Sequence, residues 1–161
     1  MEMSGKVAVI TGGTSGIGRS TAEKLLERGA TVLVLGRSRE RGAEMEQLGN
    51  CHFYPCDMAC PEEIAETCDA ILRDYPEIDI LVNNAGMSID GTVETLSLEE
   101  WNQIFAVNVT SVYLMSKYLI PAIRKRGGGR IINIASTAGT VGAPGLDAYA
   151  STKGAVIQLT R

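Results

Sequence analysis

Histidine and paired cysteines, on which much metal and nucleophilic chemistry depends, are scarce in this sequence of 161 residues. His52 is the only histidine, so the sequence does not favour a nucleophile relay built on that residue type. The four cysteines fall in one segment, at positions 51, 56, 60 and 68, without the C-x-x-C spacing of zinc sites. We therefore expect reduced thiols that partly pack as small apolar groups, and no metal site.

An excess of positive charge is also missing. The chain has 15 Lys and Arg against 19 Asp and Glu, which gives a net charge of −4 and a pI near 5.1. This balance provides no electrostatic footprint for nucleic acid or for an anionic membrane surface. The N-terminus lacks the layout of a secretory signal, and we find no apolar run long enough to span a bilayer. We expect a cytoplasmic protein that binds neither nucleic acid nor membrane.

The remaining composition is that of an ordinary globular protein, with 45% hydrophobic and 21% charged residues. Apolar runs alternate with amphipathic stretches along residues 1–161, without a composition shift that would mark a second domain. This pattern predicts a single α/β domain with a Rossmann-like, doubly wound, mostly parallel sheet. The expected strands are residues 6–11, 31–36, 52–56, 78–83 and 130–136, and the expected helices are residues 16–28, 39–48, 61–74, 98–125 (kinked at Pro121) and 146–161.

A glycine-rich stretch follows the first apolar run and precedes the first expected helix. It reads Thr11-Gly12-Gly13-Thr14-Ser15-Gly16-Ile17-Gly18. Glycines between a buried strand and a helix permit a sharp turn, let backbone approach a phosphate, and allow close packing of strand and helix. The expected ligand is therefore a nucleotide.

Two nucleotide-binding loops are compatible with this stretch. Gly12, Gly16 and Gly18 give the spacing G-x-x-x-G-x-G, which is related to the dinucleotide fingerprint. Residues 13–20 are a near match to the phosphate loop G-x-x-x-x-G-K-[ST], with Arg19 where that loop requires lysine. The stretch alone leaves both open.

The end of the second expected strand bears on cofactor choice. An acidic residue at this place usually binds the ribose hydroxyls of NAD, whereas this chain has Gly36-Arg37-Ser38-Arg39. Arg37 can bind a 2′-phosphate bidentately, with Ser38 as a neutral donor. We therefore expect NADP(H) to be favoured over NAD(H), although these arginines also fit the solvated start of a helix.

Tyr149 and Lys153 lie four residues apart in an expected helix and so share one face. A lysine ammonium one turn away favours the phenolate form of tyrosine, which suits proton exchange with a carbonyl or an alcohol. The spacing by itself is equally compatible with an ordinary pair on a helix surface.

Taken in order, these motifs resemble the short-chain dehydrogenase/reductase family over almost the whole chain, in particular members that resemble 3-oxoacyl-carrier-protein reductases. The match rests on the glycine stretch, on Asp57 after the third strand, on Asn83-Asn84-Ala85-Gly86 after the fourth, and on Asn108, Ser136 and Tyr149-x-x-x-Lys153.

The resemblance implies catalytic roles for Asn108, Ser136, Tyr149 and Lys153. Tyr149 would be the acid/base, Lys153 would assist it and bind the nicotinamide ribose, Ser136 would orient the substrate oxygen, and Asn108 would support the proton relay. The cofactor would be held by Gly12, Thr14, Ser15, Gly16, Ile17, Gly18, Arg37, Ser38, Asp57, Met58, Asn84, Ala85 and Gly86 together with Tyr149 and Lys153. The implied substrate is a small or acyl carbonyl compound or the matching alcohol, and the full-length form would be a homo-oligomer.

The family continues with further strands and helices beyond the point where this sequence stops, so we expect a C-terminally truncated chain. The fifth strand would then lie at a sheet edge despite its buried-type composition. The sequence leaves two functions open. One is an NADP(H)-dependent oxidoreductase that interconverts a carbonyl and a secondary alcohol, and the other is a nucleotide-binding but inactive fragment or interaction module.

Overall fold

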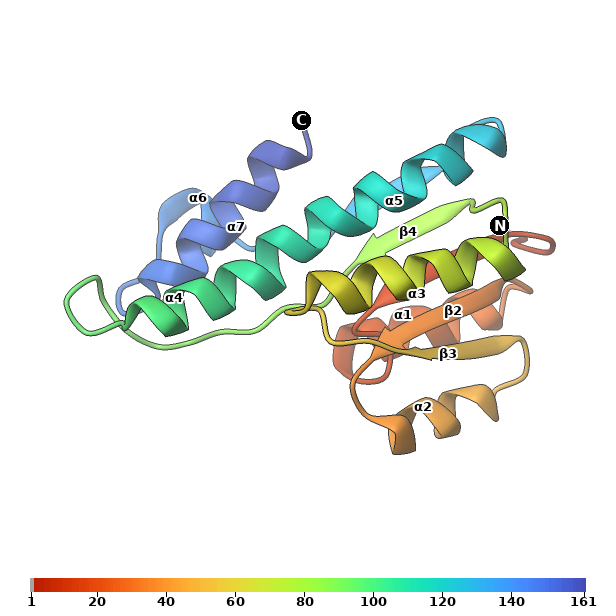
Figure 1. The fold of residues 1–161 in the computed structure, drawn as a ribbon, viewed down its shortest axis with the longest axis horizontal. Coiled ribbons are helices and arrows are strands. Elements are labelled where there is room, and N and C mark those ends of the chain that lie inside the picture. The colour runs from red at the N-terminus through yellow and green to blue at the C-terminus, as the bar shows by residue number, and fades with distance from the viewer. Residues whose placement is uncertain (1) are drawn as a thin grey trace.

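A five-stranded, wholly parallel sheet forms the centre of the computed structural model, which describes residues 2–161 (Figure 1). The strand order is β3-β2-β1-β4-β5, so the order reverses between β1 and β4. The strands are β1 (Val7–Thr11), β2 (Thr31–Gly36), β3 (Cys51–Pro55), β4 (Ile80–Asn83) and β5 (Arg130–Asn133). Ligands of such folds bind where the strand order reverses, beyond the carboxyl ends of the strands.

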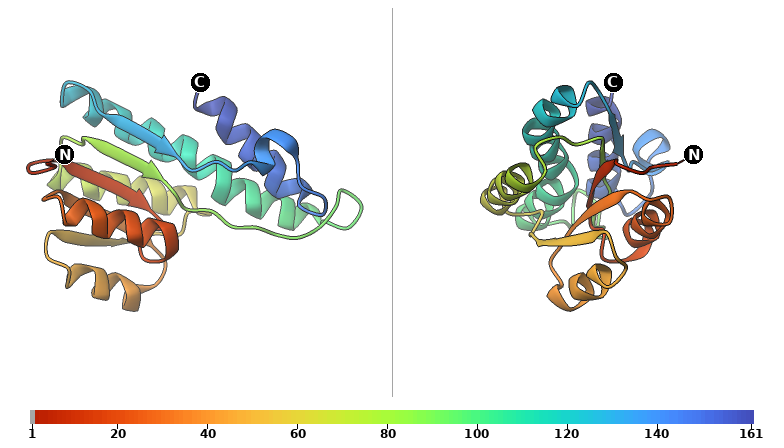
Figure 2. Two further views of the ribbon diagram at one scale, coloured as in Figure 1. Left: turned by 180° about the vertical axis from the view of Figure 1, so that it is seen from behind. Right: turned by 90° about the vertical axis from the view of Figure 1, so that its right-hand side faces the viewer.

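Helices connect the strands and cover both faces of the sheet (Figure 2). They are α1 (Gly16–Leu26), α2 (Arg39–Glu46), α3 (Pro61–Asp74), α4 (Leu98–Phe105), a π-helical turn η1 (Ala106–Thr110), α5 (Ser111–Lys125), α6 (Ala138–Val141) and α7 (Asp147–Leu159). The prediction of a Rossmann-like, doubly wound sheet is confirmed.

Two apolar clusters form the core, one on each face of the sheet. Successive residues of a strand point to opposite faces, so Val9 packs with α3 and α5 while Ile10 packs with α1 and α2. Both residues are fully buried, as are Leu33 and Val34 at the paired positions of β2. Burial on both faces explains why these strands have continuous apolar sequences instead of alternating ones.

The long helical stretch from residue 98 to residue 125 has the expected bounds, and α5 contains Pro121 and ends at Lys125. It differs from the expectation at η1, which interrupts it around Asn108. By length and composition this stretch could cross a membrane, so the expectation that no such run exists was wrong. In the fold it serves as a core helix, because Ile104, Met115 and Leu119 are fully buried against the rest of the protein.

The C-terminal part of the fold contains two further departures, besides shifts of one or two residues at the ends of other elements. Strand β5 ends at Asn133 instead of residue 136, because its partner β4 ends at the paired residue Asn83. The four-residue helix α6 was not expected from its small residues. Strand β5 lies at the edge of the sheet, as expected, and Ile132 is 47% exposed there.

Candidate cofactor and active site

The glycine turn joins the carboxyl end of β1 to the N-terminus of α1. Gly12 has φ of +64°, a conformation that favours glycine, and a side chain added at Gly18 would collide with the Gly12 carbonyl oxygen. Ser15 is the N-cap residue of α1, and its side chain makes no capping hydrogen bond. The free N–H groups of the first turn therefore remain available as donors. These groups are a suitable site for a phosphate.

Arg19 does not act as the cation of a phosphate loop. Its guanidinium is bound to Glu23 at 2.9 Å and to Glu44 at 3.0 Å. Because these two carboxylates already pair with the Arg19 side chain, it is not available to a phosphate in the turn. The structure therefore favours a dinucleotide-binding turn over the phosphate loop G-x-x-x-x-G-K-[ST].

The loop after β4 is fastened to the glycine turn by two polar residues. The Thr11 hydroxyl accepts hydrogen bonds from the backbone N–H groups of Asn84 (3.0 Å) and Ala85 (2.9 Å). The Asn84 side-chain amide donates to the carbonyl oxygens of Thr11 (3.0 Å) and Gly12 (3.3 Å). Asn84 thus positions the turn, while Ala85 and Gly86 line the cavity beside it.

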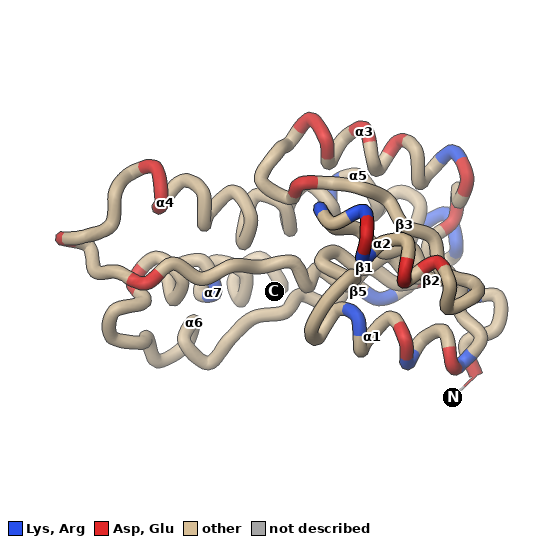
Figure 3. The backbone as a smooth tube through the Cα atoms, turned by 90° about the horizontal axis from the view of Figure 1, so that it is seen from below, with Lys and Arg blue, Asp and Glu red and all other residues tan. Residues whose placement is uncertain are grey.

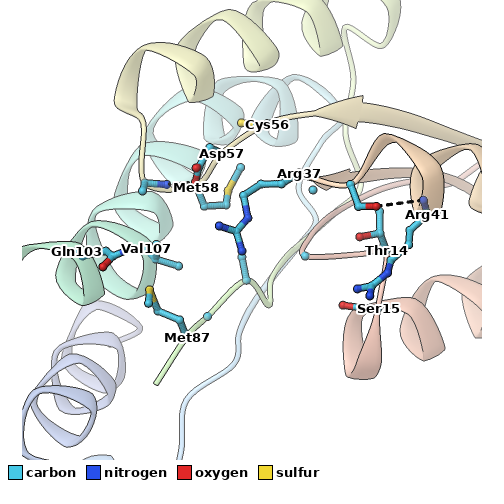
Figure 4. Close-up of a pocket in the computed structure, with 16 residues that line it drawn as sticks. Thr14, Ser15, Arg37, Arg41, Cys56, Asp57, Met58, Met87, Gln103 and Val107 are labelled. Atoms are coloured by element: carbon cyan, nitrogen blue, oxygen red, sulfur yellow. Dashed lines mark hydrogen bonds between the residues drawn. The ribbon is translucent and has the colours of Figure 1, made fainter. Parts of the chain in front are cut away.

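A cavity of about 610 Å³ opens along the carboxyl ends of the strands (Figure 4). Nine of the expected cofactor-binding residues line it: Gly12, Thr14, Ser15, Arg37, Ser38, Asp57, Met58, Ala85 and Gly86. Gly16, Ile17, Gly18 and Asn84 belong to the adjoining turn and loop without lining the cavity. The lining also includes residues that the sequence reasoning missed, namely Gly36, Arg41, Cys56, Ala59, Met87, Gln103 and Val107.

One part of the cavity wall is formed by residues 56–59, which follow β3. The Asp57 carboxylate accepts a hydrogen bond from the Ala59 N–H at 2.9 Å, and the Asp57 N–H donates to Glu63 at 2.8 Å. Asp57 therefore closes a turn and also faces the cavity. Burial raises the pKa of the neighbouring Cys56 thiol to about 11, so this cysteine is a neutral lining group.

Lys153 is the most deeply buried cation of the site, with 5% of its surface exposed. Its ammonium donates a hydrogen bond of 2.7 Å to the Ile134 carbonyl oxygen and lies 5.7 Å from the centroid of the Tyr149 ring. Burial lowers the pKa of Lys153. Tyr149 and Lys153 of α7 thus lie next to each other in the folded protein, and the Lys153 ammonium lies beside the carboxyl end of β5.

Asn108 connects this pair to the cavity. Its side chain accepts from the Met87 N–H (2.9 Å) and donates to the Met87 carbonyl oxygen (2.9 Å) and to the Thr152 hydroxyl (3.1 Å). Thr152 in turn donates to the Tyr149 carbonyl oxygen at 2.7 Å. A side chain added at Gly86, which lines the cavity, would lie 3.5 Å from Asn108 and 3.6 Å from Lys153. The cluster therefore borders the cavity at Gly86 and Met87.

Ser136 is held near α7 by the segment that contains α6. Its hydroxyl accepts a hydrogen bond of 3.2 Å from the Ala138 N–H, and Gly139 packs directly on the backbone of Lys153 and Gly154. Ser136 follows Ile134, the acceptor of the Lys153 ammonium, by two residues. Of the residues expected to be catalytic, Asn108 and Lys153 thus border the cavity at Gly86, Tyr149 lies beside Lys153, and Ser136 belongs to the segment between β5 and α6.

Comparisons with known proteins agree with this geometry. The family model described as short chain dehydrogenase matches residues 6–161. The 3-oxoacyl-[acyl-carrier-protein] reductase FabG of Vibrio harveyi is 40% identical over the whole chain, which spans 67% of that relative's length. The D-beta-hydroxybutyrate dehydrogenase of Rhizobium meliloti is 39% identical over 97% of this chain and 63% of its own length.

Among solved structures, the Pseudomonas aeruginosa RhlG/NADP active-site complex superposes with a TM-score of 0.91 and 33% identity. The superposition covers 98% of this chain and 65% of that one. The glycine turn, the cavity and the family match over almost the entire sequence lead to one assignment: the chain belongs to the short-chain dehydrogenase family of oxidoreductases.

Proposed function

We propose that the protein is an NADP(H)-dependent oxidoreductase that interconverts a carbonyl and a secondary alcohol, with Tyr149 as the acid/base. The observation that supports this most is the buried Lys153 ammonium, which lies 5.7 Å from the Tyr149 ring and adjoins the nucleotide-sized cavity at Gly86. A buried cation beside a tyrosine favours the ionised phenolate, the form that accepts a proton from an alcohol.

The cavity residues support NADP(H) as the cofactor. The glycine turn leaves the α1 N-terminus open for the pyrophosphate, and Arg37 and Ser38 lie at the end of β2 where the adenosine ribose would be bound. The structurally similar RhlG was solved as a complex with NADP. An Arg37→Glu variant should lose the preference for NADPH over NADH, and retention of that preference would contradict this assignment.

When bound, the nicotinamide supplies or accepts the hydride. During reduction, the Tyr149 hydroxyl would donate its proton to the substrate oxygen, and the Ser136 hydroxyl would hold that oxygen by a hydrogen bond. The Lys153 ammonium would stabilise the resulting phenolate. One of its three N–H groups is bound to Ile134, so the other two would be free to donate to the ribose hydroxyls. Asn108 would support the proton relay while its side chain fixes Met87 and Thr152.

We further propose a neutral or acyl carbonyl compound as substrate. The two segments beyond the catalytic residues, after β4 and before α7, are joined by a hydrogen bond of 2.7 Å from the Gly91 N–H to the Gly145 carbonyl oxygen. Few charged residues occur around α6 and α7 (Figure 3), and Lys153, the buried one, faces the tyrosine. The Vibrio harveyi relative is named as a 3-oxoacyl-[acyl-carrier-protein] reductase, which supports the acyl carbonyl class.

The test is to compare Tyr149→Phe with the wild-type chain, using simple ketones and 3-oxoacyl thioesters and following the absorbance of NADPH. Loss of an acid/base group should lower turnover by about 10²- to 10⁴-fold, while the dissociation constant of NADPH stays within about twofold. Tyr113→Phe, on the exposed surface of α5, is the matched control and should leave both values unchanged. Wild-type turnover that survives in Tyr149→Phe would refute the proposed role.

A nucleotide-binding protein without turnover is the second candidate. It is favoured by the open edge of the sheet, where Ile132 of β5 is 47% exposed, and by the fact that the chain spans about two thirds of the relatives' length. Tight binding of NADPH without turnover on any carbonyl substrate would support this candidate over the first. We also propose a homo-oligomer, in keeping with the exposed apolar side chain of Leu98 on the surface of α4.

A further inference from the structure

Two arginines enter the cofactor cavity from the β2–α2 region, and only one of them was expected. Arg37 follows the last residue of β2, and Arg41 lies in the first turn of α2. Figure 4 shows that their side chains lie on different sides of the cavity. Arg37 extends toward Asp57 and Met58, whereas the Arg41 guanidinium lies beside Thr14 and Ser15 of the glycine turn.

Both arginines are exposed in the structure of residues 2–161. Neither forms an ion pair there, although the nearby Arg19 binds two glutamates. The glycine turn itself contributes no cation to the cavity lining, since Thr14 and Ser15 are its polar members. The Arg41 guanidinium thus lies on the side of the cavity that carries the Thr14 and Ser15 hydroxyl groups, and Arg37 lies on the other side (Figure 4). Guanidinium and hydroxyl donors on two sides of one cavity suit a dianionic phosphate held between them.

The position of Arg41 is fixed by contacts on either side of it in the chain. The Ser38 hydroxyl caps α2 by accepting a hydrogen bond of 3.3 Å from the Arg41 N–H. The next residue, Gly42, packs so closely on the Phe53 ring of β3 that a side chain there would collide with it. These contacts hold α2 against β3 in an orientation that places the exposed Arg41 side chain beside the glycine turn (Figure 4).

We propose that Arg41 is a second specificity-determining residue for the adenosine 2′-phosphate, which would be bound between Arg37 and Arg41. This inference rests on the proposed use of NADP(H). Arg41 supplies the cation on the side of the glycine turn, so preference for the phosphorylated cofactor depends on both arginines and not on Arg37 alone.

The experiment measures dissociation constants of NADPH and NADH for the whole chain by nicotinamide fluorescence, and of adenosine 2′,5′-bisphosphate and AMP by calorimetry. Arg41→Ala should weaken NADPH and the bisphosphate by about tenfold, since a charge-assisted contact of this kind contributes roughly that factor. Binding of NADH and AMP should change by less than about twofold. Arg41→Lys, which keeps the charge without the fork, should fall between Arg41→Ala and wild type.

Arg39→Ala is the matched control, because Arg39 carries the same charge in the same turn of α2 but does not line the cavity. It should change NADPH binding by less than about twofold. Equal losses in Arg41→Ala and Arg39→Ala would show a general charge effect and overturn the inference while leaving NADP(H) as the cofactor. If the wild-type chain binds NADPH no better than NADH, both the proposed cofactor preference and the inference fail.

Discussion

The buried Thr11 hydroxyl makes a quantitative prediction about the junction of the two loops that form the cofactor site. Thr11 is 2% exposed, and its hydroxyl oxygen accepts two backbone hydrogen bonds, from Asn84 at 3.0 Å and Ala85 at 2.9 Å. Thr11→Val keeps the shape of the side chain and the preference for a strand but removes the acceptor. Each bond contributes about 1 kcal/mol, and the two N–H groups left without a partner add a desolvation cost. We expect a loss of about 2–4 kcal/mol in the free energy of unfolding.

The assay is urea unfolding followed by circular dichroism, together with NADPH titration. The loop after β4 would no longer be fixed to the glycine turn, so NADPH binding should weaken in Thr11→Val as well. Thr31→Val is the matched control: its hydroxyl is at the opposite end of the sheet, accepts one exposed bond of 3.2 Å from Asn50, and should change stability by less than about 0.5 kcal/mol. If Thr11→Val were as stable as Thr31→Val and bound NADPH normally, the hydroxyl could not be what joins the loops.

Two further predictions concern charge and packing away from the catalytic residues. Burial alone would raise the pKa of Asp79, but the hydrogen bonds it accepts from Lys6, a backbone N–H and Arg126 outweigh burial and lower it. The carboxylate therefore stabilises the fold above its unfolded pKa of about 4. This contribution should disappear as the pH falls through the lower, folded pKa, and Asp79→Asn should flatten the acid side of a plot of urea midpoint against pH. Gly18→Ala should weaken NADPH binding and destabilise the fold by about 1–3 kcal/mol, whereas Gly154→Ala, whose added carbon would meet its nearest atom at 3.4 Å, should change the urea midpoint and NADPH titration little.

The sheet and its helices could be predicted from the sequence because their causes are local. Residues 7–10 of β1 and 32–35 of β2 are apolar at every position, which a strand buried on both faces requires. The expected start of a helix at residue 98 is confirmed, and its cause is a local capping box in which Ser97 and Glu100 exchange two hydrogen bonds. The glycine turn could also be recognised from local sequence, because the steric reasons for its glycines lie mostly within the turn itself. Gly12 has a positive φ, and a side chain at Gly18 would collide with the Gly12 carbonyl oxygen.

Features that depend on contacts between distant segments were missed. The π-helical turn around Asn108 lies in a sequence with ordinary helical periodicity. Arg41 looked like one of several charged residues on a solvated helix, because the contact between Gly42 and Phe53 that orients α2 joins two elements. Helix α6 was hidden by its small residues, although its Gly139 is required for close packing on α7.

The bonds around Asn108 tie the nucleotide cavity to the catalytic residues more directly than the sequence motifs suggest. Met87 lines the cavity, and its backbone is held at both N–H and C=O by the Asn108 side chain. Asn108 also binds Thr152, which donates to the Tyr149 carbonyl oxygen. A nucleotide that contacts Gly86 and Met87 would therefore contact one end of the series of hydrogen bonds that runs through Asn108 and Thr152 to α7. Because Lys153 lies next to Thr152 on that helix, the cavity wall and the tyrosine–lysine pair share one set of supports, and a change in Asn108 should affect cofactor binding and turnover together.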